Sequence, residues 1–116
     1  MKQQFIQADL SKVEVMVQRL AKRFHPDKII LFGSYARGQI TNDSDVDLLV
    51  VMPVEGSKRK AAAEMDLALA DRDLPLDLIV VTPEEYDRYQ DTVGSVIYPA
   101  AQEGRVMYEQ KKTFSA

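Results

Sequence analysis

The sequence predicts an α/β fold in which a mixed central β-sheet is flanked by helices, and three observations support this class. The segments 28–32 and 46–52 are rich in β-branched residues and leucine, which is typical of strands covered on both faces. Apolar residues recur every three or four positions in 10–24 and 61–69, as they do in helices that pack on a sheet. The chain has 116 residues, so we expect residues 1–116 to form a single domain around one core.

The first half of the chain is predicted to contain a helix, two strands and a second helix. Ser11 and Glu14 have the spacing of a capping box, which predicts a helix over 11–24 with its cap at Ser11. The two apolar runs follow as central strands with an unusually tight link between them. A segment with a proline, a glycine and three cations at 53–60 then separates the second strand from the second helix.

The second half is predicted to contain another strand, at 74–81, and two helices. Thr82, Pro83 and Glu85 have the pattern of an N-cap, a first helical position and a capping box, which indicates a helix start. A last apolar stripe predicts a helix that ends at Gly104. Its members are Val93, Val96, Ile97, Ala100 and Ala101. The first three are assigned to the core in preference to a partner surface, and a docking face in part of this C-terminal region stays open as the alternative.

The end of the chain follows from two further observations. Pro99 must lie in an early turn of the last helix or kink it, because proline lacks the backbone N–H that a helix interior needs. Residues 105–109 have the composition of a short edge strand, and residues 110–116 are expected to fray.

Composition limits the classes of function. The net charge of −3 disfavours extended electrostatic binding to a nucleic-acid backbone, so we expect no direct nucleic-acid partner. The chain has no cysteine and one histidine, which argues against a disulfide framework and a zinc site. No stretch has the length and apolar character of a membrane span or signal peptide. We therefore expect a cytoplasmic protein with no membrane partner.

Two carboxylates at the start of a core strand point to metal chemistry. Asp45 and Asp47 are two positions apart and project from the same side of a strand, and Asp77 joins them if its strand is the neighbour. Like charges about 4 Å apart repel by roughly 4 kcal/mol at an effective dielectric near 20. Oxygen ligands suit Mg²⁺ or Mn²⁺, and a pair of such ions serves phosphoryl or nucleotidyl displacement. A nucleoside triphosphate is then the natural second ligand.

The residues before this acidic pair offer a place for phosphate. Gly33 ends a strand and lets backbone approach an anion closely, while Ser34 offers a hydroxyl and a backbone N–H at the start of a short helix. Arg37, one turn further on, can reach a phosphate or brace an acidic residue, and the sequence leaves both open.

These motifs carry a family resemblance. The pair Gly33-Ser34, ten intervening residues and then Asp45-Val46-Asp47 resemble the signature of the DNA polymerase beta-like nucleotidyltransferase superfamily, and Asp77 lies where that superfamily keeps a third carboxylate. The short length, the segment "GSYARG" and the C-terminal segment 94–109 look like its minimal nucleotidyltransferase (MNT) branch.

The resemblance implies a fold, a reaction and a partner. It implies the nucleotidyltransferase fold, with Gly33 and Ser34 on the triphosphate, Asp45 and Asp47 on two Mg²⁺ ions, and Asp77 on one ion and near the attacking hydroxyl. In that branch AMP passes from ATP to a tyrosine hydroxyl of a HEPN-domain ribonuclease toxin. The chain would thus be an antitoxin that AMPylates its partner and assembles with it.

Alternative interpretations remain for the same residues. Asp45 and Asp47 could belong to a solvated strand entrance, and Asp43 in the same turn is read as a loop acid or helper. Three cations, Lys58, Arg59 and Lys60, fit a solvated surface better than a phosphate or partner contact. His25 is expected to be structural.

Two alternative functions belong to different classes. One is an antitoxin that neutralises its partner by binding alone. The other is a stand-alone nucleotidyltransferase that acts on a small hydroxylated molecule.

Overall fold

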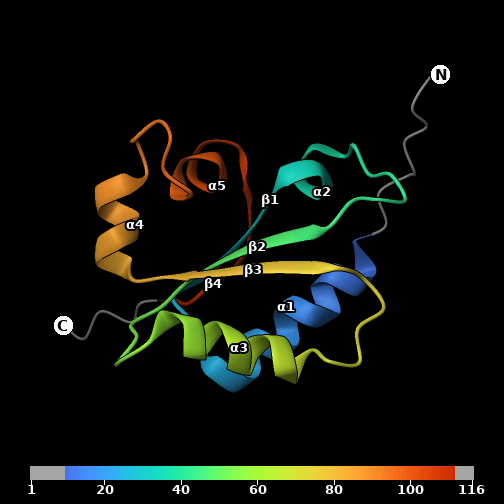
Figure 1. Ribbon diagram of the computed structural model, residues 1–116, viewed down its shortest axis with the longest axis horizontal. Coiled ribbons are helices and arrows are strands. Elements are labelled where there is room, and N and C mark those ends of the chain that lie inside the picture. The colour runs from blue at the N-terminus through green and yellow to red at the C-terminus, as the bar shows by residue number, and fades with distance from the viewer. Residues whose placement is uncertain (1–9, 112–116) are drawn as a thin grey trace.

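The protein is described by a computed structural model that covers residues 10–111, so residues 1–9 and 112–116, including most of the end expected to fray, lie outside it. Its elements follow the predicted order (Figure 1). They are α1 (Ser11–Phe24), β1 (Lys28–Phe32), α2 (Gly33–Arg37), β2 (Val46–Val51), α3 (Lys58–Ala68), β3 (Leu76–Val81), α4 (Pro83–Tyr89), α5 (Ile97–Glu103) and β4 (Arg105–Glu109).

The four strands form one mixed sheet in the order β3-β2-β1-β4. Strand β1 pairs antiparallel with both β2 and β4, whereas β2 and β3 run parallel and are connected through α3. Strands β1 and β2 are therefore central and β4 is an edge strand, as the sequence predicts.

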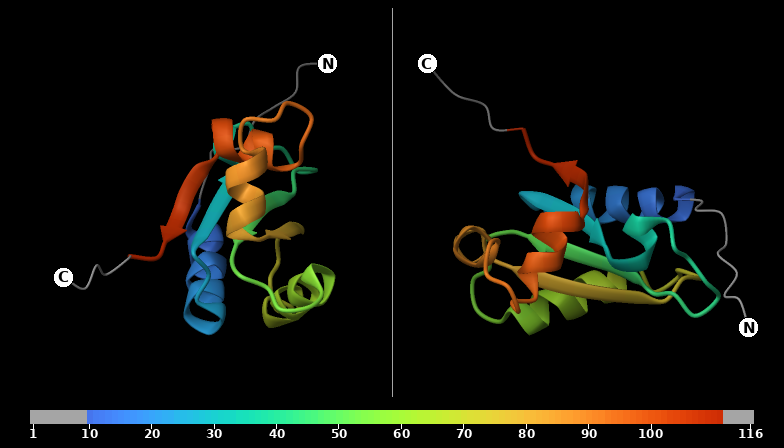
Figure 2. Two further views of the ribbon diagram at one scale, coloured as in Figure 1. Left: turned by 90° about the vertical axis from the view of Figure 1, so that its left-hand side faces the viewer. Right: turned by 90° about the horizontal axis from the view of Figure 1, so that it is seen from above.

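Helices cover both faces of this sheet (Figures 1 and 2). The larger apolar cluster joins α1 and α3 to one face and includes Leu20, Ile29, Leu48 and Met65. The smaller cluster joins α4 and α5 to the other face. No helix within residues 10–111 is long and apolar enough to cross a membrane.

The sequence motifs for helix starts predicted one helix cap correctly and one incorrectly. At α4 the predicted capping box is present, because Thr82 N–H donates to Glu85 Oε1 (2.9 Å) and Glu85 N–H donates to Thr82 Oγ1 (3.2 Å). At α1 the predicted cap at Ser11 is wrong. Leu10 occupies the cap position, since its carbonyl accepts the Glu14 N–H (2.8 Å) and Ser11 is already helical.

The last helix is shorter than its apolar stripe suggests. It begins at Ile97, so Pro99 lies in its first turn, where a missing N–H is tolerated, and Gly104 is its C-cap as predicted. The assignment of Val93 and Val96 to the core is wrong, because these side chains are 79% and 53% exposed. The chain turns at Gly94, whose φ is 94°, and this turn keeps the helical period from extending back to Val93.

Helix α5 reaches β1 through Gly104. A Cβ at this position would lie closer than 3.0 Å to the Ala100 carbonyl oxygen and to Ile30 Cγ2, both of which are fixed by the helix and the core. The close approach of α5 to the sheet therefore depends on a residue without a side chain.

Gly104→Ala is expected to lower the free energy of unfolding by about 1–3 kcal/mol, the range for overpacked core sites. Gly56→Ala serves as a reference for backbone strain without a clash, because Gly56 has a φ of 89° and a Cβ there would meet no atom within 4 Å. Chemical denaturation measures both variants. An unchanged free energy of unfolding for Gly104→Ala would contradict the packing argument.

Candidate active site

The predicted carboxylates lie at one end of the sheet, on the face that α4 and α5 cover. Strands β2 and β3 pair in register, so that Asp47 is directly opposite Asp77, and Asp45 comes immediately before β2. Side chains alternate along a strand, and Asp47 thus shares its face with Leu49 in the smaller cluster. Asp45 and Asp77 are exposed and Asp47 is half-buried.

Gly33 connects the phosphate motif to the acidic motif. Phe32 pairs with Asp47 across β1 and β2, and the chain then turns at Gly33, whose φ is 73°. A Cβ at Gly33 would collide with Asp47 Oδ2, at less than the 3.0 Å that Cβ atoms keep. The position thus requires glycine twice, for its left-handed backbone and for the contact with the carboxylate.

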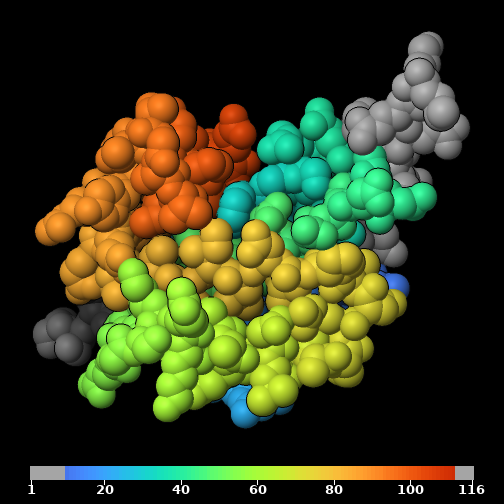
Figure 3. Space-filling view, in the orientation of Figure 1, coloured from blue at the N-terminus to red at the C-terminus, as the bar shows by residue number. Residues whose placement is uncertain are grey.

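The connection between β1 and β2 is anchored at several points. Tyr35 of α2 and Ile40 are buried in the larger cluster. The turn after them is closed by Thr41 and Ser44, since Thr41 N–H donates to Ser44 Oγ (2.9 Å) and Ser44 N–H to the Thr41 carbonyl (3.1 Å). Asp43 is exposed in this turn. In the space-filling view the connection, cyan to green, adjoins the yellow start of β3 (Figure 3).

The charges at the site act mainly on Asp47. Burial raises the pKa of the Asp47 carboxyl, the nearby negative charges of Asp77 and Asp45 raise this pKa further, and the positive charge of Arg37 lowers it. The Arg37 side chain itself is exposed and donates to Gln39 Oε1 (3.3 Å). The structure thus shows a charge interaction of Arg37 with Asp47, and a contact of Arg37 with phosphate stays a prediction.

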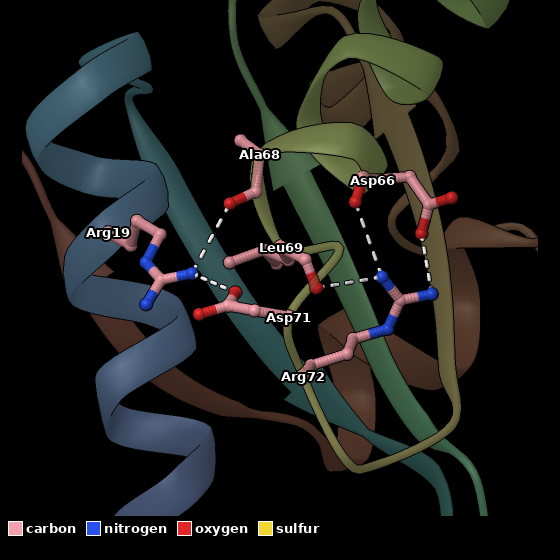
Figure 4. A network of polar contacts seen from close by, with 6 residues as sticks. All are labelled: Arg19, Asp66, Ala68, Leu69, Asp71 and Arg72. Carbon is pink, nitrogen blue, oxygen red and sulfur yellow. Dashed lines mark hydrogen bonds and ion pairs between the residues drawn. The ribbon is translucent and has the colours of Figure 1, made fainter.

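Two arginines fix the loop that leads from α3 to Asp77 (Figure 4). Arg19 of α1 forms an ion pair with Asp71 and donates to the Ala68 carbonyl (3.3 Å). Arg72 donates to the carbonyls of Asp66 (3.2 Å) and Leu69 (3.0 Å) and forms an ion pair with the Asp66 carboxylate. Residue spacing alone does not reveal the role of Arg19, because its contact with Ala68 spans 49 residues and leaves no local pattern. Arg72 contacts residues only three and six positions away, a local signal that the sequence-based prediction did not use.

The three carboxylates do not close around a single point. Across residues 10–111, no group of three or more His, Cys, Asp or Glu side chains lies close enough together to hold a metal ion. The three side chains supply only oxygen donors, which suit Mg²⁺ or Mn²⁺. Asp77 lies opposite Asp47 in the sheet, and the exposed Asp45 precedes Asp47 by two positions.

The other residues considered from sequence lie away from this cluster or at the surface. Lys58, Arg59 and Lys60 are exposed at the start of α3, and Lys58 forms an ion pair with Glu85 (2.6 Å). His25 is the left-handed C-cap of α1, with a φ of 50°, which is the structural role expected of it.

Comparison with known proteins gives the family. The model of the nucleotidyltransferase domain matches residues 13–99, about three quarters of the chain, and this range contains every site residue described above. The chain belongs to the nucleotidyltransferase domain family. Its mixed α/β sheet is the sheet of that family's fold.

Two relatives of this nucleotidyltransferase domain come from Methanocaldococcus jannaschii, and both are named as candidate protein adenylyltransferases. One is 64% identical over 28 residues and the other 51% identical over 37 residues. These matches span 24% and 29% of the present chain but only 28% and 37% of the two relatives.

Two solved structures share the fold. A candidate nucleotidyltransferase of Sulfolobus solfataricus has a TM-score of 0.55 at 23% identity and covers 91% of this chain and 85% of its own. A toxin–antitoxin structure with AMP-PNP has a TM-score of 0.56 at 19% identity and covers 88% of this chain and 76% of its own. At these identities the likeness establishes the fold alone.

Gly33→Ala is expected to destabilise the nucleotidyltransferase domain by about 2 kcal/mol or more, because left-handed strain of about 1–2 kcal/mol adds to the collision with Asp47. Gly38→Ala is the matched control, since Gly38 has a φ of 71° and open space around a Cβ. Urea denaturation compares the two. Equal losses of unfolding free energy would show that the contact with Asp47 contributes nothing.

Asp47→Asn is expected to raise the Tm of the metal-free protein at pH 7. The ordinary pKa of an aspartyl carboxyl is 3.8 and the folded value for Asp47 is higher, so folding is favoured most below 3.8 and less as pH rises through the folded value. Solvent screening limits the gain to on the order of 0.5 kcal/mol, or about 2 °C.

Calorimetry in a chelator at pH 7 and pH 3.5 measures this effect, with Asp43→Asn as the control for the loss of one exposed charge. The difference in Tm between Asp47→Asn and the wild type should shrink at pH 3.5, because the Asp47 carboxyl of the wild type is then largely protonated and, like asparagine, uncharged. A Tm below that of the wild type at pH 7 would contradict the electrostatic interpretation.

Proposed function

We propose that this nucleotidyltransferase domain transfers AMP from ATP to a tyrosine hydroxyl of a partner HEPN ribonuclease toxin and thereby neutralises the toxin. The observation that carries the proposal is the contact of Gly33 with Asp47, together with the register that sets Asp77 opposite Asp47. These contacts bring the glycine-serine turn and two carboxylates to one end of the sheet. A nucleotidyl transfer needs a phosphate site next to metal ligands.

Each site residue has a proposed role. Gly33 and Ser34 would hold the triphosphate, because the turn at Gly33 brings backbone next to Asp47 without a side chain between them. Arg37 would contribute positive charge to the same region, where it already lowers the pKa of Asp47. Asp45 and Asp47 would ligate metal, and Asp77 would ligate one ion and orient the acceptor hydroxyl.

Mg²⁺, with Mn²⁺ as a possible substitute and two ions in the working state, fits the donor chemistry of this carboxylate set. Asp45, Asp47 and Asp77 would hold the metal, which would supply positive charge to offset that of the carboxylates and the triphosphate. The protein's own contribution is geometric, since β2 and β3 hold Asp47 and Asp77 side by side on a rigid sheet.

The bond changes of the proposed reaction are simple. The tyrosine oxygen forms a bond to the α-phosphorus of ATP, the bond from that phosphorus to the bridging oxygen breaks, and pyrophosphate leaves. The hydroxyl proton passes to solvent or to the Asp77 carboxylate, whose exposure leaves room for an incoming hydroxyl.

Names of similar proteins support the choice of substrate and partner. Two relatives are named as candidate protein adenylyltransferases, and one structural neighbour is a toxin–antitoxin assembly solved with AMP-PNP. A further neighbour is a toxin–antitoxin variant in which two aspartates two positions apart are replaced by glutamate, the spacing of Asp45 and Asp47 here. We infer a complex with the toxin, and place the reaction in the cytoplasm, which suits a chain without cysteine.

The double variant Asp45→Asn with Asp47→Asn is expected to lower AMP transfer to the toxin by about 100-fold or more, because it removes two proposed metal ligands. Labelled ATP, Mg²⁺ and a purified HEPN-domain protein from the same organism measure transfer. Asp43→Asn is the control, since it makes the same chemical change in the exposed turn just before Asp45 and should keep full activity.

Undiminished labelling by the double variant would overturn the assigned roles. If the double variant still neutralises the toxin, and neither it nor the wild type changes the mass of the toxin, the protein would instead be an antitoxin that acts by binding. Turnover of a small hydroxylated acceptor without the toxin would indicate a stand-alone enzyme.

A further inference from the structure

An exposed apolar surface lies on the connection between α4 and α5. Six large apolar side chains in residues 10–111 are more than a third exposed, and three of them fall within the eight residues 89–96: Tyr89 (39%), Val93 (79%) and Val96 (53%). Single exposed apolar residues are ordinary, whereas a group within one short segment marks a contact surface. We call these three side chains the 89–96 surface.

The backbone beneath the 89–96 surface is tied down by hydrogen bonds. Ser95 Oγ donates to the Tyr89 carbonyl (3.0 Å) and accepts the Tyr98 N–H (3.1 Å), which folds the segment back on itself. Gln102 of α5 donates to the Gln90 carbonyl (3.0 Å) and to Asp91 Oδ1 (3.1 Å). The apolar side chains are thus presented on a pre-organised loop, and little conformational entropy remains to be lost on binding.

The segment of chain that carries the 89–96 surface is acidic. Residues 83–104 contain five acidic side chains and one basic side chain, whereas the rest of the chain contains thirteen acidic and fourteen basic ones. The whole net negative charge of the protein therefore belongs to the α4–α5 region. Such a surface complements a partner that is basic and apolar.

The 89–96 surface lies on the same face of the sheet as the carboxylates but toward its opposite end, because Asp77 is at the start of β3 and α4 follows the end of that strand (Figure 1). Helix α5 contacts β1, α2 and α4, and so connects the loop to the element that begins at Gly33 (Figures 1 and 2). The two remaining exposed apolar residues on helices, Val15 and Leu67, belong to α1 and α3 on the opposite face.

We propose that the 89–96 surface docks the acceptor protein of the transfer reaction through a basic and apolar patch of that protein. This inference rests on the proposed function for its partner. A ribonuclease must attract RNA phosphates and therefore carries a cationic surface. The acidic α4–α5 region meets such a surface with the opposite charge, and Tyr89, Val93 and Val96 supply apolar contact at its centre.

The first test replaces the apolar side chains. The double variant Val93→Ser with Val96→Ser is expected to raise the Kd for the toxin and the KM for toxin in AMP transfer by about tenfold each, with kcat and the affinity for ATP unchanged. The matched control is Val15→Ser with Leu67→Ser, which removes two similarly exposed apolar side chains from the α1–α3 face. It should leave both constants unchanged.

The second test replaces acidic side chains of α4, which lie outside the hydrogen-bonded loop that carries Val93 and Val96. Glu84→Gln with Asp87→Asn is expected to raise the Kd for the toxin and to weaken its dependence on salt. Glu14→Gln with Glu64→Gln, two exposed carboxylates on α1 and α3, is the control and should change neither.

Binding is measured by calorimetry without ATP, so that docking and transfer are judged separately. If the wild type binds the toxin but transfers no AMP, the proposed function fails while the docking proposal is still decided by Kd. A wild-type affinity in both the apolar and the charge variants, or an equal loss in variants of the α1–α3 face, would overturn the docking proposal.

Discussion

The contact between Gly33 and the carboxylate of Asp47 is the constraint on which the rest of this site depends. It joins residues fourteen positions apart at the place where β1 ends and β2 begins. The antiparallel pairing of Phe32 with Asp47 sets the approach, and the left-handed turn at Gly33 carries the chain away from the strand. Any side chain at Gly33 would push the carboxylate off the position that the sheet gives it.

The sheet extends this constraint to the third carboxylate. Parallel register places Asp77 opposite Asp47, and a slip of one residue in β3 would turn Asp77 to the α1–α3 face. Apolar side chains on both faces of β2 oppose such a slip, because Leu48 and Leu49 belong to different core clusters. The arginine contacts of Arg19 and Arg72 add a second restraint, since they fix the loop through which the chain enters β3.

The sequence predicted what is encoded locally. Central strands, the capping box at Thr82 and the end of α5 at Gly104 each follow from a few adjacent residues, and the structure confirms them. From the sequence, Asp47 and Asp77 could be expected to be neighbours only if their strands pair, because strand order depends on contacts between distant parts of the chain. The close approach of Gly33 to Asp47 and the role of Arg19 depend on distances between segments, so residue spacing alone did not reveal them.

Val93 and Val96 show that one apolar pattern can mark either a buried helix face or an exposed contact surface. Their spacing continues the stripe of α5, which favoured a core assignment, but the turn at Gly94 ends the periodicity and leaves both side chains exposed. An exposed valine in a mobile loop would contribute little to a specific contact, because binding would have to order the loop at a cost in conformational entropy. Here hydrogen bonds from Ser95 and Gln102 hold the loop before any partner arrives. A stable fold needs the apolar stripe only from Ile97 onward, so the two valines are free to serve recognition.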